Sequence, residues 1–305
     1  AHTSVYTSPP AEALAERLVG HRPGGLSHAL FLSGGAEATE AAIKLARQYF
    51  VEIGQPQRDR FIVRRQDFHG NTLGAYAASG NRGRNGPYEP LLSDRFRQVG
   101  QAFAYRHQRP DESEAQFVAR LAGELEAEFQ RLGPQTVAAF IAETVVGSTL
   151  GAVPAPAGYF RAARDICDRH GALLILDEVM CGIGRTGTLH AWEQEGIAPD
   201  IQMNSKGLGG GYQPIAAILI QAPVVAALQH GSGALLHGHT YSGHPVACAA
   251  ALEVQTIIAE DNLLANVQAM GARMFERLHD RLGNHAHVGD IRGRGLFAGI
   301  ELVQD

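Results

Sequence analysis

The chain has 305 residues, of which 45% are hydrophobic and 19% charged, with a formal net charge of −5 at pH 7. This length allows a substantial buried core, and the composition excludes global disorder. Because acidic and basic residues are interspersed and the net charge is mildly negative, nucleic acid or an anionic membrane is not expected as the main partner. The 14 histidines show no recognisable metal-ligand spacing, so no metal site is predicted.

Cysteine content and terminal segments bear on the compartment. Cys167, Cys181 and Cys248 are too few and too scattered for a disulfide framework, which favours a reducing, cytoplasmic compartment. No apolar run is long enough to span a bilayer, and no signal peptide is visible. Because the chain begins with Ala1 and ends at Asp305, just after a strand-like run, we keep open that it is a fragment or the ordered part of a longer protein.

The first half of the chain alternates helical and extended patterns. Residues 36–53 place their alanines, Leu45 and Tyr49 on one face, which is typical of an amphipathic helix. Residues 112–132 show the same pattern and end at Gly133-Pro134. The elements predicted here, in chain order, are helix 11–19, strand 29–32, helix 36–53, strand 60–64 and helix 112–132.

The second half contains uninterrupted apolar strands separated by helices, a pattern typical of a parallel sheet covered on both faces. The predicted elements are strand 137–142, helix 158–170, strands 172–176, 201–203 and 215–220, helices 246–259 and 263–282, and strand 296–303. We therefore predict an α/β fold. Residues 1–262 are assigned to a large domain, and 263–305 to a connecting helix and the incomplete start of a smaller C-terminal domain.

Asp177 comes directly after the apolar run 172–176. In doubly wound sheets functional groups gather beyond the carboxyl ends of the strands. A buried carboxylate at such a place needs a cationic or hydrogen-bonding partner, because otherwise its pKa rises and it becomes neutral. Taken alone, a helix cap or a structural ion pair explains Asp177 at least as well as a functional role.

Lys206 follows a short strand and precedes Gly207-Leu208-Gly209-Gly210-Gly211. Glycines permit close backbone approach around whatever the lysine contacts. This run does not match G-x-G-x-x-G, and the chain has no Walker A sequence, so nucleotide binding lacks its usual support. By itself the loop could equally be a plain surface turn, and only its combination with Asp177 favours a site.

The combined motifs strongly resemble the class III (omega-type) aminotransferases, which are fold type I pyridoxal-phosphate enzymes. The resemblance rests on Asp-Glu-Val at 177–179, Gly-Arg-Thr-Gly at 184–187 and the Lys-Gly run at 206–211. It extends, in the right order, through 33–47, 68–70, 143–154 and 239–249, and weakly through 292–302. It implies a mostly parallel seven-stranded-type sheet between helices, a pyridoxal-phosphate-binding large domain and pyridoxal 5′-phosphate as cofactor.

For the two central residues, the resemblance implies that Lys206 forms the Schiff base with the cofactor. Once released, this lysine would move a proton between the substrate's alpha carbon and the cofactor. Asp177 would pair with the pyridinium nitrogen and keep it protonated, which makes the ring an effective electron sink.

The same resemblance assigns further cofactor contacts. Gly35 and Ala36 match the phosphate-binding turn at a helix N-terminus, where free N–H groups and the helix dipole favour an anion. Phe68 and Val179 match the residues on the two faces of the cofactor ring, and His69 is included among the cofactor-binding residues. Without the other motifs, 33–35 could be an N-cap with a tight turn, and Phe68 and Val179 could be ordinary core residues.

Two further matches concern partners. Thr240 matches the threonine that reaches the cofactor phosphate of the neighbouring subunit, so the resemblance implies a homodimer with shared active sites. Glu143 matches a glutamate near the substrate entrance, although an acid that merely ends the strand 137–142 is equally plausible.

Several positions depart from the family. Met180 stands where ornithine- and aminobutyrate-type members carry a glutamine, and a thioether cannot donate a hydrogen bond, which favours the broader omega-amine group. Thr144, Val146 and Ser148 replace the usual Pro, Gln and Glu. The family's carboxylate-binding arginine lies further along the C-terminal domain than this chain extends. Arg292 and Arg294 are interpreted as structural or surface residues in a strand-entry turn.

The resulting hypothesis is a transaminase that moves an amino group from an amine or omega-amino acid to a keto acid such as pyruvate or 2-oxoglutarate. The alternatives are another pyridoxal-phosphate reaction on the same scaffold (decarboxylation, racemisation, an aminomutase or a phospho-lyase reaction) or a non-catalytic remnant of the fold. A nicotinamide-dependent oxidoreductase would also fit the alternating elements, but it lacks the glycine fingerprint.

Overall fold

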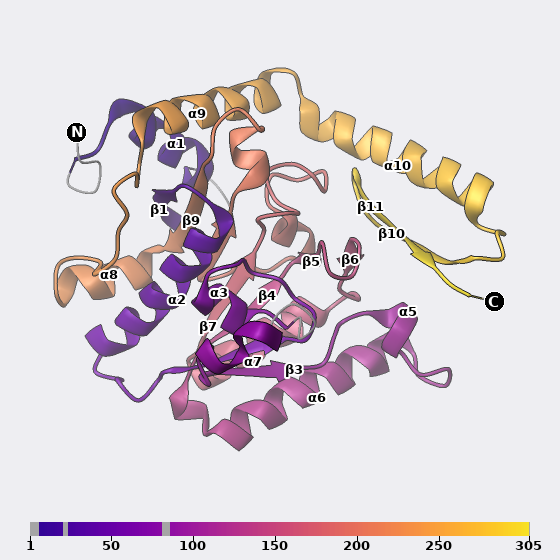
Figure 1. Ribbon diagram of the computed structural model, residues 1–305, viewed down its shortest axis with the longest axis horizontal. Helices are drawn as coiled ribbons and strands as arrows, with labels where there is room; N and C mark the ends of the chain where they lie inside the picture. Colours follow the sequence, from indigo (N-terminus) through magenta and orange to yellow (C-terminus); the bar gives the residue numbers. More distant parts are fainter. Residues whose placement is uncertain (1–5, 21–23, 81–85, 305) are drawn as a thin grey trace.

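The computed structural model describes residues 6–20, 24–80 and 86–304. Its centre is a seven-stranded sheet, drawn in Figure 1. The strands lie in the order β1 (Leu26–Leu32), β9 (Ala216–Gln221), β8 (Ile201–Asn204), β7 (Leu173–Asp177), β4 (Val137–Glu143), β2 (Arg60–Arg64) and β3 (Phe96–Val99). Within this sheet β9 alone runs against the other strands, pairing antiparallel with β1 and β8. The predicted mostly parallel α/β sheet is therefore confirmed.

Helices cover both faces of the sheet because its central strands are apolar on both sides. In β7, Leu174 and Leu176 belong to one hydrophobic cluster, whereas Leu173 and Ile175 belong to another. The first cluster is completed by α1 (Pro9–Val19), α6 (Glu114–Leu132), α7 (Tyr159–His170) and α9 (Pro245–Glu260). The second is completed by α2 (Gly35–Glu52), α3 (Leu73–Ala78) and α8 (Ala222–His230).

Local sequence signals set where these helices begin and end. The α6 helix starts at a capping box in which the Ser113 hydroxyl accepts the N–H of Gln116 and the Gln116 side chain accepts the N–H of Ser113. The α7 helix ends at Gly171, whose φ of +63° is left-handed. Only two residues separate the end of β1 from the start of α2, so the N-terminus of α2 lies at the carboxyl end of that strand.

The C-terminal part is a long helix followed by a hairpin, which Figure 1 shows at one side of the molecule. The α10 helix (Leu263–Leu282) contacts both α9 and β10 (Val288–Arg294), and β10 pairs antiparallel with β11 (Phe297–Leu302) in a sheet of its own. Arg292 and Arg294 do not lie in a strand-entry turn, as the sequence suggested, but within β10. They are structural, since Arg292 donates to the carbonyl oxygens of Leu150 and Gly151 and Arg294 pairs with Glu195.

Shorter elements complete the described chain: η1 (Gly86–Leu91), α5 (Ala104–His107), η2 (Pro134–Thr136), the β5 (Val145–Val146) and β6 (Val153–Pro154) pair, η3 (Ala191–Glu195) and η4 (Lys206–Gly209). The cysteines Cys167, Cys181 and Cys248 are free and buried. Among the described helices, none has the length and apolar character needed to cross a membrane.

Candidate active site

A cavity of about 470 Å³ lies at the carboxyl ends of the parallel strands, a volume in the range of small-ligand sites. The predicted site residues that line it are Gly35, Ala36, Phe68, His69, Glu143, Asp177, Val179 and Lys206. These residues come from segments far apart in the sequence, and the sheet brings them together because parallel strands end at one edge.

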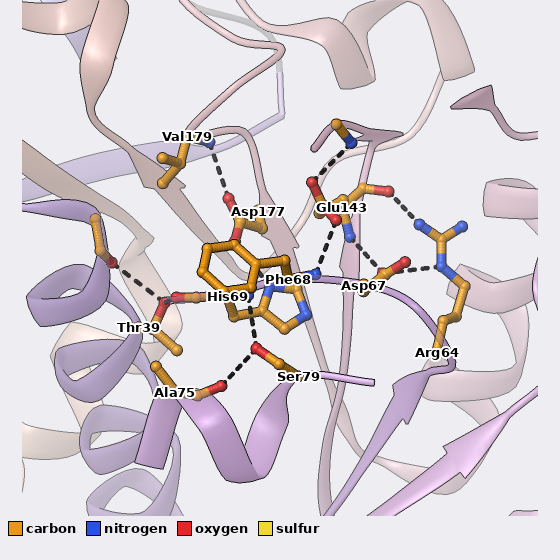
Figure 2. A network of polar contacts seen from close by, with 12 residues as sticks. Thr39, Arg64, Asp67, Phe68, His69, Ala75, Ser79, Glu143, Asp177 and Val179 are labelled. Atoms are coloured by element: carbon orange, nitrogen blue, oxygen red, sulfur yellow. Dashed lines mark hydrogen bonds and ion pairs between the residues drawn. The ribbon is translucent and has the colours of Figure 1, made fainter. Parts of the chain in front are cut away.

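Asp177, the last residue of β7, is nearly buried and its carboxylate is held from two sides (Figure 2). Its Oδ2 lies 2.7 Å from Nδ1 of His69, and its Oδ1 accepts the N–H of Val179 at 2.9 Å. Burial lowers the pKa of His69, but the hydrogen bond and the charge of Asp177 outweigh it, so the pKa is raised overall. His69 therefore orients the carboxylate and stabilises its negative charge.

Lys206 opens η4 immediately after Ser205, which follows β8. Its φ of +43° is left-handed, a conformation that a non-glycine residue keeps only when its surroundings impose it. Ser205 supplies one such restraint, since its hydroxyl donates to the carbonyl oxygen of Ile215 at 2.9 Å. The acid and the amine predicted to act together thus line one cavity.

The N-terminus of α2 forms a third part of the cavity wall. The first N–H groups of a helix have no intrahelical acceptor and face outward from its end, where they can bind an anion. The segment 68–70 packs against the N-terminal part of α2, since the Thr39 hydroxyl donates to the carbonyl oxygen of His69 at 2.6 Å. Gly70 allows the approach: it has a φ of +132°, and a Cβ there would lie 2.6 Å from Cβ of Ala36.

Glu143, the last residue of β4, is held by a group of contacts that the sequence did not reveal. Its Oε2 accepts the N–H of Phe68 and its Oε1 that of Gly147, each at 3.0 Å. Behind it, Arg64 and Asp67 form a buried ion pair with an Nε–Oδ2 distance of 3.0 Å. Burial first, and then the charges of Asp67 and Asp177, raise the pKa of Glu143 to about 8.

Glu178 is a residue to which the sequence analysis gave no role, although it stands beside Asp177. The side chain is fully buried and accepts the N–H groups of Ala191 and Trp192, both at 2.8 Å, and the Thr144 hydroxyl at 3.0 Å. Gln202 adds a fourth donor at 3.3 Å. Burial raises the pKa of Glu178 to about 7 against these donors, which lower it. The sequence signal that could have identified Glu178 is its position in an Asp-Glu pair directly after an apolar strand.

Met180 and Ser148, two positions that depart from the family, also line the cavity. A Cβ at position 147 would lie 2.4 Å from the sulfur of Met180, so a larger residue there would force this flexible thioether to move. At position 180 the cavity wall is apolar, whereas ornithine- and aminobutyrate-type members of the family carry the amide of a glutamine.

Thr240 is the predicted site residue that lies outside the described cavity wall. It is exposed in the segment between α8 and α9. A residue that serves the neighbouring subunit is expected to lie away from the cavity of its own subunit, and the position of Thr240 is compatible with that prediction.

Comparison with known proteins places this arrangement in a family. The model of the family described as "Aminotransferase class-III" matches residues 1–305. An aminotransferase of Gibberella zeae is 52% identical over 96% of this chain and 58% of its own length. An uncharacterized aminotransferase of Schizosaccharomyces pombe is 47% identical over all of this chain and 66% of its own length. A crystal structure of the omega transaminase from Pseudomonas jessenii in complex with PMP has a TM-score of 0.94 and 38% identity, covering 99% of this chain and 67% of that one.

The chain belongs to the class III aminotransferase family. It spans 58% and 66% of the length of the two curated relatives named above. Class III aminotransferases use pyridoxal phosphate, and the residues present fit that group. The cavity combines an amine, a buried carboxylate and a helix N-terminus, which match its aldehyde, ring nitrogen and phosphate.

Proposed function

We propose that this protein is a pyridoxal-phosphate-dependent transaminase that moves an amino group from an amine or omega-amino acid to a keto acid such as pyruvate or 2-oxoglutarate. The observation that carries the proposal is that Lys206 and Asp177 line one cavity at the carboxyl ends of the strands. The family of the chain and the omega transaminase fold of its structural neighbour support it.

In this proposal Lys206 holds the cofactor through its amine and, once released by the substrate, carries the proton at the substrate's alpha carbon. Bound pyridoxal phosphate supplies an electron sink for the bond broken at that carbon. Asp177 keeps the ring nitrogen protonated, and His69 holds the Asp177 carboxylate in place. Phe68 and Val179 pack on the ring, and Gly35 and Ala36 bind the phosphate through their N–H groups.

We further propose a homodimer in which Thr240 binds the phosphate in the partner's site. Exposed large hydrophobic side chains close to Thr240 in the chain support an interface, because apolar groups that gather on a surface often mark a contact with another protein. They are Leu236, Tyr241 and Val246.

We also propose a domain division and a cellular compartment for this protein. Residues 263–305 form the connecting helix and the start of a small C-terminal domain; the separate β10–β11 sheet supports this division. The protein works in a reducing compartment such as the cytoplasm, which the free state of its buried cysteines supports.

Spectroscopy of the purified protein tests the function. We expect a visible cofactor band in the parent that Lys206→Ala lacks, and bleaching of the parent band by amine donors in a half-reaction screen. Stoichiometric consumption of keto acid with formation of amino acid identifies transamination rather than decarboxylation, racemisation or elimination. A parent protein that binds pyridoxal phosphate no better than Lys206→Ala would refute the proposal and favour a non-catalytic role.

A further inference from the structure

Glu143 is the buried acid of the cavity whose role the family resemblance left open. We propose that it is a positioning residue: it fixes the main chain of Phe68 and of the turn at 147–149, rather than binding the substrate. The inference rests on the proposed function, because there Phe68 is the residue that packs on the cofactor ring.

Both the side chain and the main chain of Glu143 are already engaged (Figure 2). Its two carboxyl oxygens accept the N–H groups of Phe68 and Gly147. Its own N–H donates to Oδ2 of Asp67 at 2.9 Å, and its carbonyl oxygen accepts from Arg64. Any movement of the side chain toward a ligand would leave two main-chain N–H groups without acceptors, a cost that opposes substrate binding.

The segment that Glu143 holds needs such restraint. Gln66 has a φ of +67°, a strained value for a non-glycine residue, which persists only when neighbouring contacts over-determine it. One tie comes from Thr149, whose hydroxyl donates to the carbonyl oxygen of Gln66. A second is the contact of the His69 N–H with the Ser79 hydroxyl at 2.9 Å. Between these two contacts, the hydrogen bond from the N–H of Phe68 to Glu143 restrains the main chain at Phe68.

Charge also argues against a substrate-binding role. Glu143 is buried next to Asp67 and Asp177, and burial together with the charges of these two acids raises its pKa. The surroundings therefore disfavour additional negative charge at this place, and both carboxyl oxygens are already used as acceptors for main-chain N–H groups.

The test replaces one carboxyl oxygen by a group that cannot accept. In Glu143→Gln, either Phe68 or Gly147 loses its acceptor. We expect an altered visible circular dichroism of the bound cofactor, and a half-reaction rate that falls by about tenfold, the value of one buried hydrogen bond. The rate should fall equally for benzylamine and for an omega-amino acid, because the substitution changes how Phe68 is held against the cofactor and not a contact with the substrate. In cofactor-free protein, amide hydrogen exchange should become faster at Phe68 or at Gly147, whichever loses its acceptor.

Asp200→Asn is the matched control. Asp200 also accepts a main-chain N–H, that of Leu174 at 2.7 Å, near the other end of β7 and outside the cavity. This variant should leave the cofactor signal, the half-reaction rate and exchange at Phe68 unchanged. Thr149→Val removes the hydrogen bond from the Thr149 hydroxyl to the carbonyl oxygen of Gln66 in the same segment. It should change the cofactor dichroism and lower the half-reaction rate in the same direction as Glu143→Gln, and it replaces that variant if Glu143→Gln folds poorly.

Three results would overturn the inference. One is a Glu143→Gln protein whose KM rises for the omega-amino acid alone, with unchanged dichroism, which would make Glu143 a substrate ligand. Another is an equal effect of Asp200→Asn. The third is unchanged exchange at both Phe68 and Gly147, which can be measured without cofactor. Failure of the parent to bind pyridoxal phosphate would instead refute the proposed function.

Discussion

The contact between His69 and Asp177 is buried, so its strength depends on the charge of the imidazole. Because the pKa of His69 is raised above its ordinary 6.5, the folded state holds this proton more tightly than the unfolded state does. By linkage, the stabilisation is complete below pH 6.5 and is lost as the pH rises through the folded pKa.

This linkage predicts the behaviour of His69→Asn, which retains a donor for Asp177 but no titratable charge. In cofactor-free protein, the unfolding free energy of the parent should exceed that of the variant by about 1–3 kcal/mol near pH 6. The difference should shrink toward pH 9. Urea unfolding of both proteins across this range measures it. A difference that stays constant with pH would contradict a charged His69.

Glu178 allows a second prediction at this scale. In Glu178→Gln the new amide N–H₂ must face donors, so at least one N–H of Ala191 or Trp192 loses its acceptor. We expect a loss of about 1–3 kcal/mol in unfolding free energy, the penalty for a buried unpaired donor. Glu260→Gln, an exposed change at the end of α9, serves as control in the same urea titration. Equal stability of the two variants would show that the Glu178 contacts contribute nothing.

Among the elements, the junction of α2 with the segment 68–70 depends on a glycine. In Gly70→Ala the new methyl would meet Ala36, and the backbone would keep an unfavourable positive φ. We expect destabilisation of about 1–3 kcal/mol and weaker binding of pyridoxal phosphate, because the phosphate turn shifts. Gly123→Ala, at an open position within α6, should instead stabilise by up to about 1 kcal/mol. Absorbance titration with cofactor and urea unfolding check both variants.

Several elements could be predicted from the sequence because they carry a strong signal. The strands β4 and β7 are uninterrupted apolar runs, and α6 has a clear amphipathic period with a glycine stop. The strand β3 was missed because it is a short edge strand in which Arg97 and Gln98 break the apolar run. The strand β10 was missed because its glycines and charges mimic a turn.

The candidate site divides in the same way. The sequence predicted Lys206, Asp177 and the turn before α2 because each lies at or just after the end of a strand, where functional groups gather in such sheets. The ion pair of Arg64 with Asp67 and the contacts of Glu143 join a strand end to loops. Such contacts have no sequence period, and only the folded arrangement reveals them. The reversed direction of β9 was likewise invisible, because an apolar strand reads the same in either sense.

For the whole molecule, shared sites in a homodimer predict complementation between two defective subunits. Thr240→Ala should weaken both sites of its dimer, and Lys206→Ala should abolish both. In a mixed dimer, one site combines Lys206 of one subunit with Thr240 of the other and is intact. A co-refolded equal mixture should recover about a quarter of parental activity, since half the dimers are mixed and each has one good site. No recovery above the average of the two variants would place Thr240 in its own subunit's site.

The burial of all three thiols has a practical consequence for such experiments. Burial raises the pKa of Cys167 to about 12 and that of Cys248 to about 11, and it raises that of Cys181 well above its ordinary value. Since the thiolate is the reactive form, maleimide reagents should leave the native protein unlabelled at neutral pH. A single cysteine introduced on the β10–β11 hairpin would therefore be labelled with a fluorophore, while the native cysteines would not react. Because the three native cysteines would remain unlabelled, the signal used to measure distances between subunits would come from the introduced site.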